Sequence, residues 1–302
     1  KGIAIATAVL AATALFGAFD TTVKDKLSAA AASTFNLSVD RPNVLVGVII
    51  GASVVFMFAG LLILAVGRAA QRVVLEVRNQ FRTHPGIMDY TEKPDYARVV
   101  DICTKDSLRE LVTPGILAIL TPIAVGFALG YAPLGSYLAG AIAAGVLMAV
   151  FLANSGGAWD NAKKLVEDGN HGGKGSPAHE ATIIGDTVGD PFKDTAGPAI
   201  NPLIKVMNLV ALLIAPTVVE YSSNIGLRVG VALGAIIIVI AAIVFSKRRS
   251  AGTGGAAPAA TEVGGAVSPV LEGVSPVNGA DIADAAARVD TADRATAAKR
   301  TE

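Results

Sequence analysis

Long apolar runs alternate with shorter polar stretches along most of this chain of 302 residues. Because a helix needs about 20 mainly apolar residues to cross a bilayer, the pattern predicts six membrane-spanning helices. They are expected at about 2–19, 43–67, 111–132, 136–155, 195–218 and 226–246. The fifth run carries polar residues along one side of its first half, which is typical of a helix that faces a polar pathway. The predicted fold is therefore an all-α, polytopic transmembrane helix bundle.

The last part of the chain has a different composition. From residue 250 onward Ala, Gly, Pro, Thr and Asp predominate, and large apolar residues are scarce. Such a segment cannot bury enough apolar surface to form a core. We therefore expect residues 1–249 to form the bundle and residues 250–302 to form a disordered tail.

Composition and charge narrow the class of protein. Hydrophobic residues make up 52% of the chain, as a membrane protein requires. The 25 basic and 25 acidic residues cancel, so no basic excess exists to neutralise a nucleic acid, and nucleic-acid binding is excluded as a function. Cys103 is the single cysteine, so the chain forms no internal disulfide. The three histidines, His84, His171 and His179, occupy polar segments without metal-ligand spacing and are interpreted as solvated.

Basic residues predict the orientation in the membrane. The connection 68–109 carries eight Lys and Arg residues, and the sixth apolar run ends in Lys247, Arg248 and Arg249. By the positive-inside rule both regions are expected in the cytoplasm. Counting crossings then places residues 156–194 on the same side, together with the tail, while 20–42, 133–135 and 219–225 face outward.

Two charged motifs lie at this side. Residues 156–164 read Gly-Gly-Ala-Trp-Asp-Asn-Ala-Lys-Lys, and residues 185–195 read Gly-Asp-Thr-Val-Gly-Asp-Pro-Phe-Lys-Asp-Thr. In the second motif Asp186, Asp190 and Asp194 recur every four residues, so on a helix they share one face at about 6 Å per step. Carboxylates this close repel one another unless a cation bridges them, and Mg²⁺ with phosphate oxygens is the usual solution. The motifs therefore indicate a metal and phosphate site, although a charged membrane border would also explain Lys163 or Lys164 taken alone.

Lys205 is the one charged residue deep within an apolar run. It follows Asp194 by eleven residues, which on an ideal helix rotates it by about 20° and places it roughly 16 Å deeper, with Asn201 between them. A lysine within a span costs about 2.5 to 3.5 kcal/mol, so we expect it to pair with an acid. No acid in the six predicted spans lies deep enough, which indicates a partner outside this chain.

The two motifs resemble the signature motifs of the membrane-integral, ion-pumping inorganic pyrophosphatases. Further matches are Glu-Val-Arg-Asn-Gln-Phe at 76–81, Lys-Pro-Asp-Tyr at 93–96 and Lys-Gly-Ile-Ala-Ile at 1–5, and the resemblance covers about residues 1–220. It implies hydrolysis of inorganic pyrophosphate coupled to outward ion pumping, with Mg²⁺ as the cofactor. It also implies a multi-pass protein of the cell membrane, a cytoplasmic catalytic face and a homodimer.

The resemblance also implies a role for each residue of the motifs. Asp160, Asp186 and Asp190 correspond to Mg²⁺ ligands, and Lys1, Lys163 and Lys193 to pyrophosphate contacts. Asp194 corresponds to the acid that orients the attacking water, Lys205 to a gate lysine, and Asn201 lies with Lys205 on the ion pathway.

The resemblance extends to the pumped ion and to the length of the protein. Residues 195–202 (Thr-Ala-Gly-Pro-Ala-Ile-Asn-Pro) are similar to the potassium-independent, proton-pumping branch, so we expect H⁺, with Na⁺ as the alternative. Family members carry acidic motifs on earlier helices, and Lys1 is not preceded by Met. We therefore expect the chain to be the C-terminal portion of a longer pump, to hold about half of the catalytic ligands and to be inactive alone. The sixth run and the tail depart from the common family pattern.

The residues alone are also compatible with other functions. The same acids and lysines could bind a passenger in a phosphate or divalent-cation transporter, or the chain could be a membrane scaffold. The Gly-rich stretch 168–180 could cradle phosphate, but it lacks the spacing of a P-loop, and a mobile connection or lid explains it better.

Overall fold

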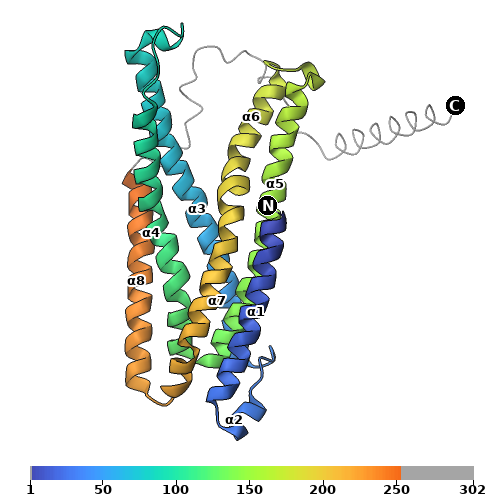
Figure 1. Cartoon of the computed structure of the whole chain (residues 1–302), viewed down its shortest axis with the longest axis vertical. Coiled ribbons are helices and arrows are strands. Elements are labelled where there is room, and N and C mark those ends of the chain that lie inside the picture. Colours follow the sequence, from blue (N-terminus) through green and yellow to red (C-terminus); the bar gives the residue numbers. More distant parts are fainter. Residues whose placement is uncertain (1, 253–302) are drawn as a thin grey trace, which may run out of the picture. The chain divides into compact units, whose positions relative to one another are not determined.

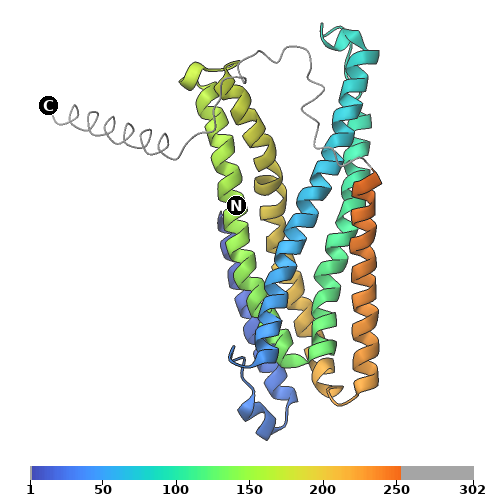
Figure 2. The ribbon, with the colours of Figure 1, turned by 180° about the vertical axis from the view of Figure 1, so that it is seen from behind.

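The computed structural model describes residues 2–252, and nothing is described of Lys1 or of 253–302 (Figures 1 and 2). The described part is helical and contains no strand. Its elements, in order, are α1 (Gly2–Lys26), α2 (Ala29–Thr34), α3 (Pro42–Thr83), η1 (Pro85–Ile87), α4 (Tyr96–Leu129), α5 (Tyr131–Glu167), η2 (Asn170–Gly172), α6 (Pro177–Asp190), η3 (Pro191–Ala196), α7 (Gly197–Glu220) and α8 (Ile225–Gly252).

Six helical stretches within residues 2–252 are long and apolar enough to cross a membrane. One of them, Pro177–Glu220, is formed by α6, η3 and α7 in continuous succession. The prediction of an all-α bundle with six spans is therefore confirmed. The predicted disordered tail falls almost entirely outside the described residues, so its conformation stays a prediction.

The helices are longer than the apolar runs that predicted them. α3 continues to Thr83 and α4 begins at Tyr96, so most of the connection 68–109 is helical. The hairpin closes where two of the short motifs meet. Gln80 Oε1 accepts the Asp95 N–H at 2.9 Å, and Gln80 Nε2 donates to the Asp95 carbonyl at 3.1 Å. The Asp95 carboxylate caps α4 by accepting the Arg98 N–H at 3.0 Å.

Ion pairs between α3 and α4 continue this hairpin toward the apolar part of the bundle. Arg68 pairs with Glu110, and Arg72 with Asp106. Ser246 of α8 accepts from Arg68 at 3.5 Å, so the last helix covers the inner end of this pair. The side chains of Arg68 and Glu110 are only 12% and 19% exposed, which explains why they are paired.

The other end of α8 is held by Arg228. Its guanidinium donates to the carbonyls of Phe127 and Ala128 at the end of α4, both at 3.1 Å, and to the Ser222 carbonyl at 2.9 Å. These are helix-end carbonyls that lack intrahelical partners. Arg228 also lines a cavity of about 310 Å³ that includes Arg41 and Tyr131. Polar contacts at both ends therefore fasten α8 to α4.

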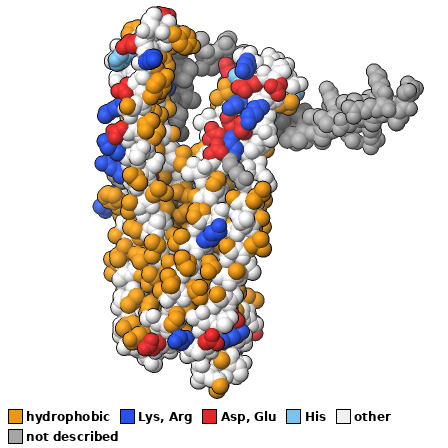
Figure 3. Space-filling model, in the orientation of Figure 1, with side chains coloured by type: hydrophobic (Ala, Val, Ile, Leu, Met, Phe, Trp, Pro, Cys, Tyr) orange, Lys and Arg blue, Asp and Glu red, His pale blue; other side chains and the backbone are white. Residues whose placement is uncertain are grey.

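Successive helices run in opposite directions, so both charged motifs lie at the same end as the α3–α4 hairpin (Figures 1 and 2). In Figure 3 the charged side chains gather at the two ends of the bundle, with a broad hydrophobic band between them. The arrangement matches the side-by-side placement of the motifs that counting crossings predicted.

One prediction about local geometry is wrong. The stretch from Asp186 to Lys205 is not an ideal α-helix, because residues 191–196 form the π-helical segment η3. Pro191 stands at its start and has no N–H to donate within the preceding turn. A π segment adds residues to a turn, so it changes the angular position around the helix of every residue that follows it in α7. Asp194 and Lys205 therefore do not keep the angular relation that an ideal helix would give them.

Candidate functional site: an acid and lysine cluster between two helices

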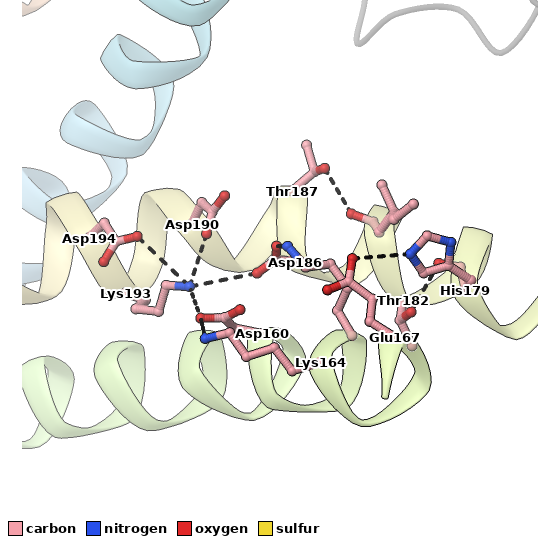
Figure 4. Close-up of polar contacts among 12 residues, drawn as sticks. Asp160, Lys164, Glu167, His179, Thr182, Asp186, Thr187, Asp190, Lys193 and Asp194 are labelled. Atoms are coloured by element: carbon pink, nitrogen blue, oxygen red, sulfur yellow. Dashed lines mark hydrogen bonds and ion pairs between the residues drawn. The ribbon is translucent and has the colours of Figure 1, made fainter. Parts of the chain in front are cut away.

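The ammonium of Lys193 lies at the centre of four carboxylates (Figure 4). Its Nζ is 2.7 Å from Asp160, 3.1 Å from Asp190, 3.6 Å from Asp186 and 3.8 Å from Asp194. The Lys193 side chain is only 13% exposed, so its charge needs these partners. Asp160 comes from α5 and the other acids from α6 and η3, so this one lysine joins the two sequence motifs.

Lys163 extends the cluster along α5. Its ammonium donates to the Asp186 carboxylate, across the same pair of helices. The neighbouring Lys164 differs, because it pairs with Asp160 at 3.1 Å within one helix and its side chain is 61% exposed. Of the two lysines that the sequence left ambiguous, Lys163 therefore belongs to the buried cluster. We call Asp160, Lys163, Asp186, Asp190, Lys193 and Asp194 the charge cluster.

Two glycines let the helices approach closely enough for these contacts. A β-carbon on Gly156 would lie 2.7 Å from Lys193 Cβ, and one on Gly189 would lie 3.1 Å from Gly156 Cα. Beside them the rings of Trp159 and Phe192 contact each other, with centroids 5.9 Å apart. Gly156 and Gly189, one from each motif, therefore set the distance between α5 and the chain that carries Lys193.

The acids of the cluster have different surroundings. The side chain of Asp186 is 9% exposed, whereas those of Asp190 and Asp194 are 51% and 55% exposed. Asp186 Oδ1 is buried and has no hydrogen-bond partner, since Lys193 Nζ stays 3.6 Å away. A buried carboxylate oxygen without a donor is costly, and a hard cation is the kind of ligand that satisfies it.

The donor set therefore fits Mg²⁺, which prefers carboxylate and phosphate oxygens. Among the described residues, no group of three acidic, His or Cys side chains is already arranged around a common metal position. Lysines occupy the space between the acids instead. The cluster as it stands combines four carboxylates with two ammonium groups, a formal excess of two negative charges that a divalent cation would offset.

The family model for the inorganic H⁺ pyrophosphatases matches residues 1–214 of this chain. The chain belongs to this family. The match includes every member of the charge cluster and ends within α7, so α8 lies beyond it.

Relatives agree with this assignment. The chain is 66% identical over 267 residues to the "K(+)-insensitive pyrophosphate-energized proton pump" of Streptomyces avermitilis, covering 84% of this chain and 33% of the relative. It is 54% identical over 226 residues to the protein of the same name from Chloroflexus aurantiacus, covering 72% and 29%. A Clostridium tetani protein provisionally named as a K(+)-stimulated pyrophosphate-energized sodium pump is 48% identical over 221 residues, covering 73% and 32%. The chain spans about a third of the length of these relatives. With its six apolar helices, it is a multi-pass membrane protein.

Two other predicted residues of this H⁺ pyrophosphatase family member, Asn201 and Lys205, lie on α7 outside the charge cluster. Asn201, on α7, donates to the Ala4 carbonyl of α1 at 3.0 Å, and its buried Oδ1 has no hydrogen-bond partner. Lys205 lies one turn further along α7 and is half-buried, with no ion pair to any residue of 2–252. Lys1 lies outside the described residues.

One interpretation from the sequence is wrong. His179 is not in a solvated loop but in the first turn of α6, where its side chain is 15% exposed and contacts Glu167 of α5 at 3.2 Å. His84 and His171 are exposed, as predicted. The missed signal was Ser176 followed by Pro177, a helix-start pattern that places His179 inside the helix.

Proposed function

We propose that this chain forms part of a membrane pump that hydrolyses inorganic pyrophosphate, with Mg²⁺ as cofactor, and moves protons outward. The observation that carries the proposal is the charge cluster, in which Lys193 Nζ lies within 3.8 Å of four carboxylates at one end of a bundle of long apolar helices. Family membership and the names of the relatives support the same activity.

The cluster has the groups that pyrophosphate hydrolysis needs. Asp160, Asp186 and Asp190 would hold Mg²⁺, which when bound neutralises charge on the diphosphate and on the leaving phosphate. Lys163 and Lys193 are each held by carboxylates that phosphate oxygens of the substrate could replace. These ammonium groups would then bind and orient the anion where negative charge accumulates during cleavage.

Asp194 would orient the attacking water and accept its proton. It is the half-exposed acid of η3 and lies furthest along the chain toward α7, so a proton taken there would stand at the start of the span. Lys1 is proposed as a further pyrophosphate contact from the family resemblance.

Asn201 and Lys205 are proposed to line the ion pathway beneath the cluster. A lysine within a membrane span needs an acid, and residues 2–252 supply none to Lys205. We propose that further helices of the same pump provide this acid and the remaining site residues, that the pump is a homodimer, and that this chain alone is inactive. The basic α3–α4 hairpin favours a cytoplasmic position for the catalytic end.

Proton pumping is proposed over sodium pumping because residues 195–202 are similar to the potassium-independent branch and the Streptomyces and Chloroflexus relatives carry proton-pump names. The test places the native gene product in sealed vesicles and supplies Mg²⁺ and pyrophosphate. Phosphate release together with lumen acidification, unaffected by Na⁺ and K⁺, is the expected result.

Each alternative function predicts a different outcome of this vesicle experiment. Labelled Na⁺ uptake without primary acidification would replace H⁺ by Na⁺. Flux of phosphate or a divalent cation without pyrophosphate cleavage would indicate a transporter. If neither pyrophosphate cleavage nor ion flux occurs, the chain is a membrane scaffold and the proposal is refuted.

A further inference from the structure

A histidine bridge joins the two helices that carry the charge cluster, at the end opposite to the glycines. The ring of His179 lies against α5, with Nε2 3.2 Å from Glu167 Oε1 (Figure 4). The other ring nitrogen, Nδ1, accepts the Gly175 N–H at 3.1 Å. Glu167 is the last residue of α5 and Gly175 belongs to the connection that follows, so one side chain binds the start of α6 to both.

These two contacts determine which nitrogen of the ring carries the proton. A backbone N–H can only donate, so Nδ1 must be the bare acceptor nitrogen. The proton of the neutral ring is therefore on Nε2, which donates to the Glu167 carboxylate. Each nitrogen has its own task, because Nε2 links helix to helix and Nδ1 links helix to connection.

The bridge adds a side-chain restraint to a connection that is rich in glycine and otherwise held by its own short-range hydrogen bonds. Between α5 and α6 the backbone adopts positive φ at Gly169, His171, Gly172, Gly173 and Gly175. Glycine accepts such angles at low steric cost but loses the most conformational freedom when it is ordered. A connection this rich in glycine cannot by itself hold two helices at a defined separation.

Asp160, Lys163 and Asp186 of the charge cluster lie on the stretch of α5 and α6 between two fixed points. At one end Gly156 and Gly189 bring the helices into close contact. At the other end Glu167 meets His179. The two stretches have nearly the same length, eleven residues on α5 and ten on α6, or about 16 Å and 15 Å of helix. Two antiparallel helices of equal length, fixed at both ends, keep their facing side chains in register.

We propose that His179 is a positioning residue for the metal and substrate site: by bridging Glu167 and Gly175 it holds the α5 half of the charge cluster at a defined distance from the α6 half. The inference rests on the proposed function, because it concerns the spacing at which Asp160 on α5 and Asp186 on α6 would share Mg²⁺. The hydrogen bonds of the His179 ring go to Glu167 and Gly175, and neither residue belongs to the charge cluster. Lys163, which pairs with Asp186, and Glu167, which contacts His179, are four residues apart and therefore lie on one face of α5.

Three substitutions of His179 test separately the hydrogen bond from Nε2 to Glu167 and the hydrogen bond that Nδ1 accepts from Gly175. In His179→Gln the amide nitrogen reaches the place of Nε2, so the link to Glu167 is kept. In His179→Asn the amide oxygen takes the place of Nδ1, so only the link to Gly175 is kept. His179→Leu keeps neither link while filling similar space.

The first measurement is the Mg²⁺ concentration that half-saturates pyrophosphate hydrolysis by the native gene product. Removing a partner that orients a metal site costs 10- to 100-fold in metal affinity, so we expect His179→Leu and His179→Asn to raise this concentration about tenfold. At saturating Mg²⁺ their kcat should stay within about twofold of the parent. His179→Gln should stay near the parent in both quantities.

The second measurement is amide hydrogen exchange in the first turns of α6, without Mg²⁺ or pyrophosphate. We expect faster exchange in His179→Leu and His179→Asn than in His179→Gln. This readout does not depend on turnover, so it tests the bridge even if the proposed function is wrong.

His171→Asn is the matched control, because His171 is an exposed histidine of the same connection and asparagine also accepts its positive φ. It should leave both measurements at parent values. Glu167→Gln, whose amide oxygen can still accept from Nε2, should be milder than Glu167→Leu. The proposal is overturned if His179→Leu resembles His171→Asn, or if His179→Gln and His179→Asn give the same result.

Discussion

Adding one methyl group to Gly156 should separate the two halves of the charge cluster. In Gly156→Ala the new β-carbon would lie 2.7 Å from Lys193 Cβ and 3.0 Å from the Lys193 nitrogen. Carbon atoms in contact prefer about 3.5 to 4.0 Å, so α5 and η3 must move apart by about 1 Å. Overpacking of this kind costs about 1 to 3 kcal/mol of stability, which a folded bundle of this size should survive.

The effect on activity should be larger than the effect on folding. A misplacement of about 1 Å can cost about 100-fold in rate, because Asp160 lies on the helix that moves and its partner Lys193 on the one that stays. We therefore expect kcat/KM for pyrophosphate to fall by about 100-fold in Gly156→Ala. The assay is phosphate release by the native gene product in detergent, with thermal unfolding of the same sample measured beside it.

The neighbouring glycine supplies the control. A β-carbon on Gly157 would meet no atom within 4 Å. Gly157→Ala should therefore keep parent activity and gain up to about 1 kcal/mol of stability from its helix propensity. If both alanine variants lose activity equally, or if Gly156→Ala keeps it, the close approach of α5 and η3 does not set the geometry of the site.

Three further predictions concern other parts of the molecule. Asp190→Asn should insert into the membrane normally but raise the Mg²⁺ concentration for half-maximal hydrolysis by about 100-fold; undiminished turnover at low Mg²⁺ would remove Asp190 from the metal site. Lys205→Ala should lower proton transport per pyrophosphate cleaved by about tenfold or more, since the acid that pairs with it would be left buried and would take up a proton. Dye-monitored acidification beside phosphate release measures this ratio, and a parent value would make Lys205 a structural charge only. Arg228→Ala should destabilise the fold by about 2 to 3 kcal/mol, because three carbonyls lose a charged donor. Thermal unfolding compares it with Arg41→Ala, which lines the same cavity, and an equal loss in both would contradict the role of Arg228 in fastening α8.

The sequence predicted the site because its residues are local in two motifs. Asp186, Asp190, Lys193 and Asp194 lie within nine positions of one another, and Asp160 with Lys163 within four. Acids and lysines concentrated at the ends of apolar helices are unusual enough to be noticed without a structure. The spacing also predicted that the acids would lie near one another, and all of them do reach Lys193.

The same reasoning failed where local patterns do not carry the information. An even spacing of acids implies an ideal helix, but Pro191 starts a π segment that changes the angle of everything below it. Histidines in a polar stretch imply solvent, but the start of α6 at Pro177 brings His179 against Glu167 twelve residues earlier. The apolar runs alone do not show how far α3 and α4 extend, since α3 continues to Thr83, α4 begins at Tyr96 and ion pairs join the two helices beyond those runs.

By itself, the sequence determined the class of this protein, because apolar runs of membrane-crossing length and two charged motifs are properties of neighbouring residues. The tertiary structure alone decided which charges share a site. Lys193 meets Asp160 across 33 positions of sequence and Lys163 meets Asp186 across 23, and only the contact of two antiparallel helices at Gly156 and Gly189 brings them together. The physical reason is that charge pairing in a low-dielectric interface depends on distances of a few ångströms, and packing of α5 against α6 and η3 determines those distances.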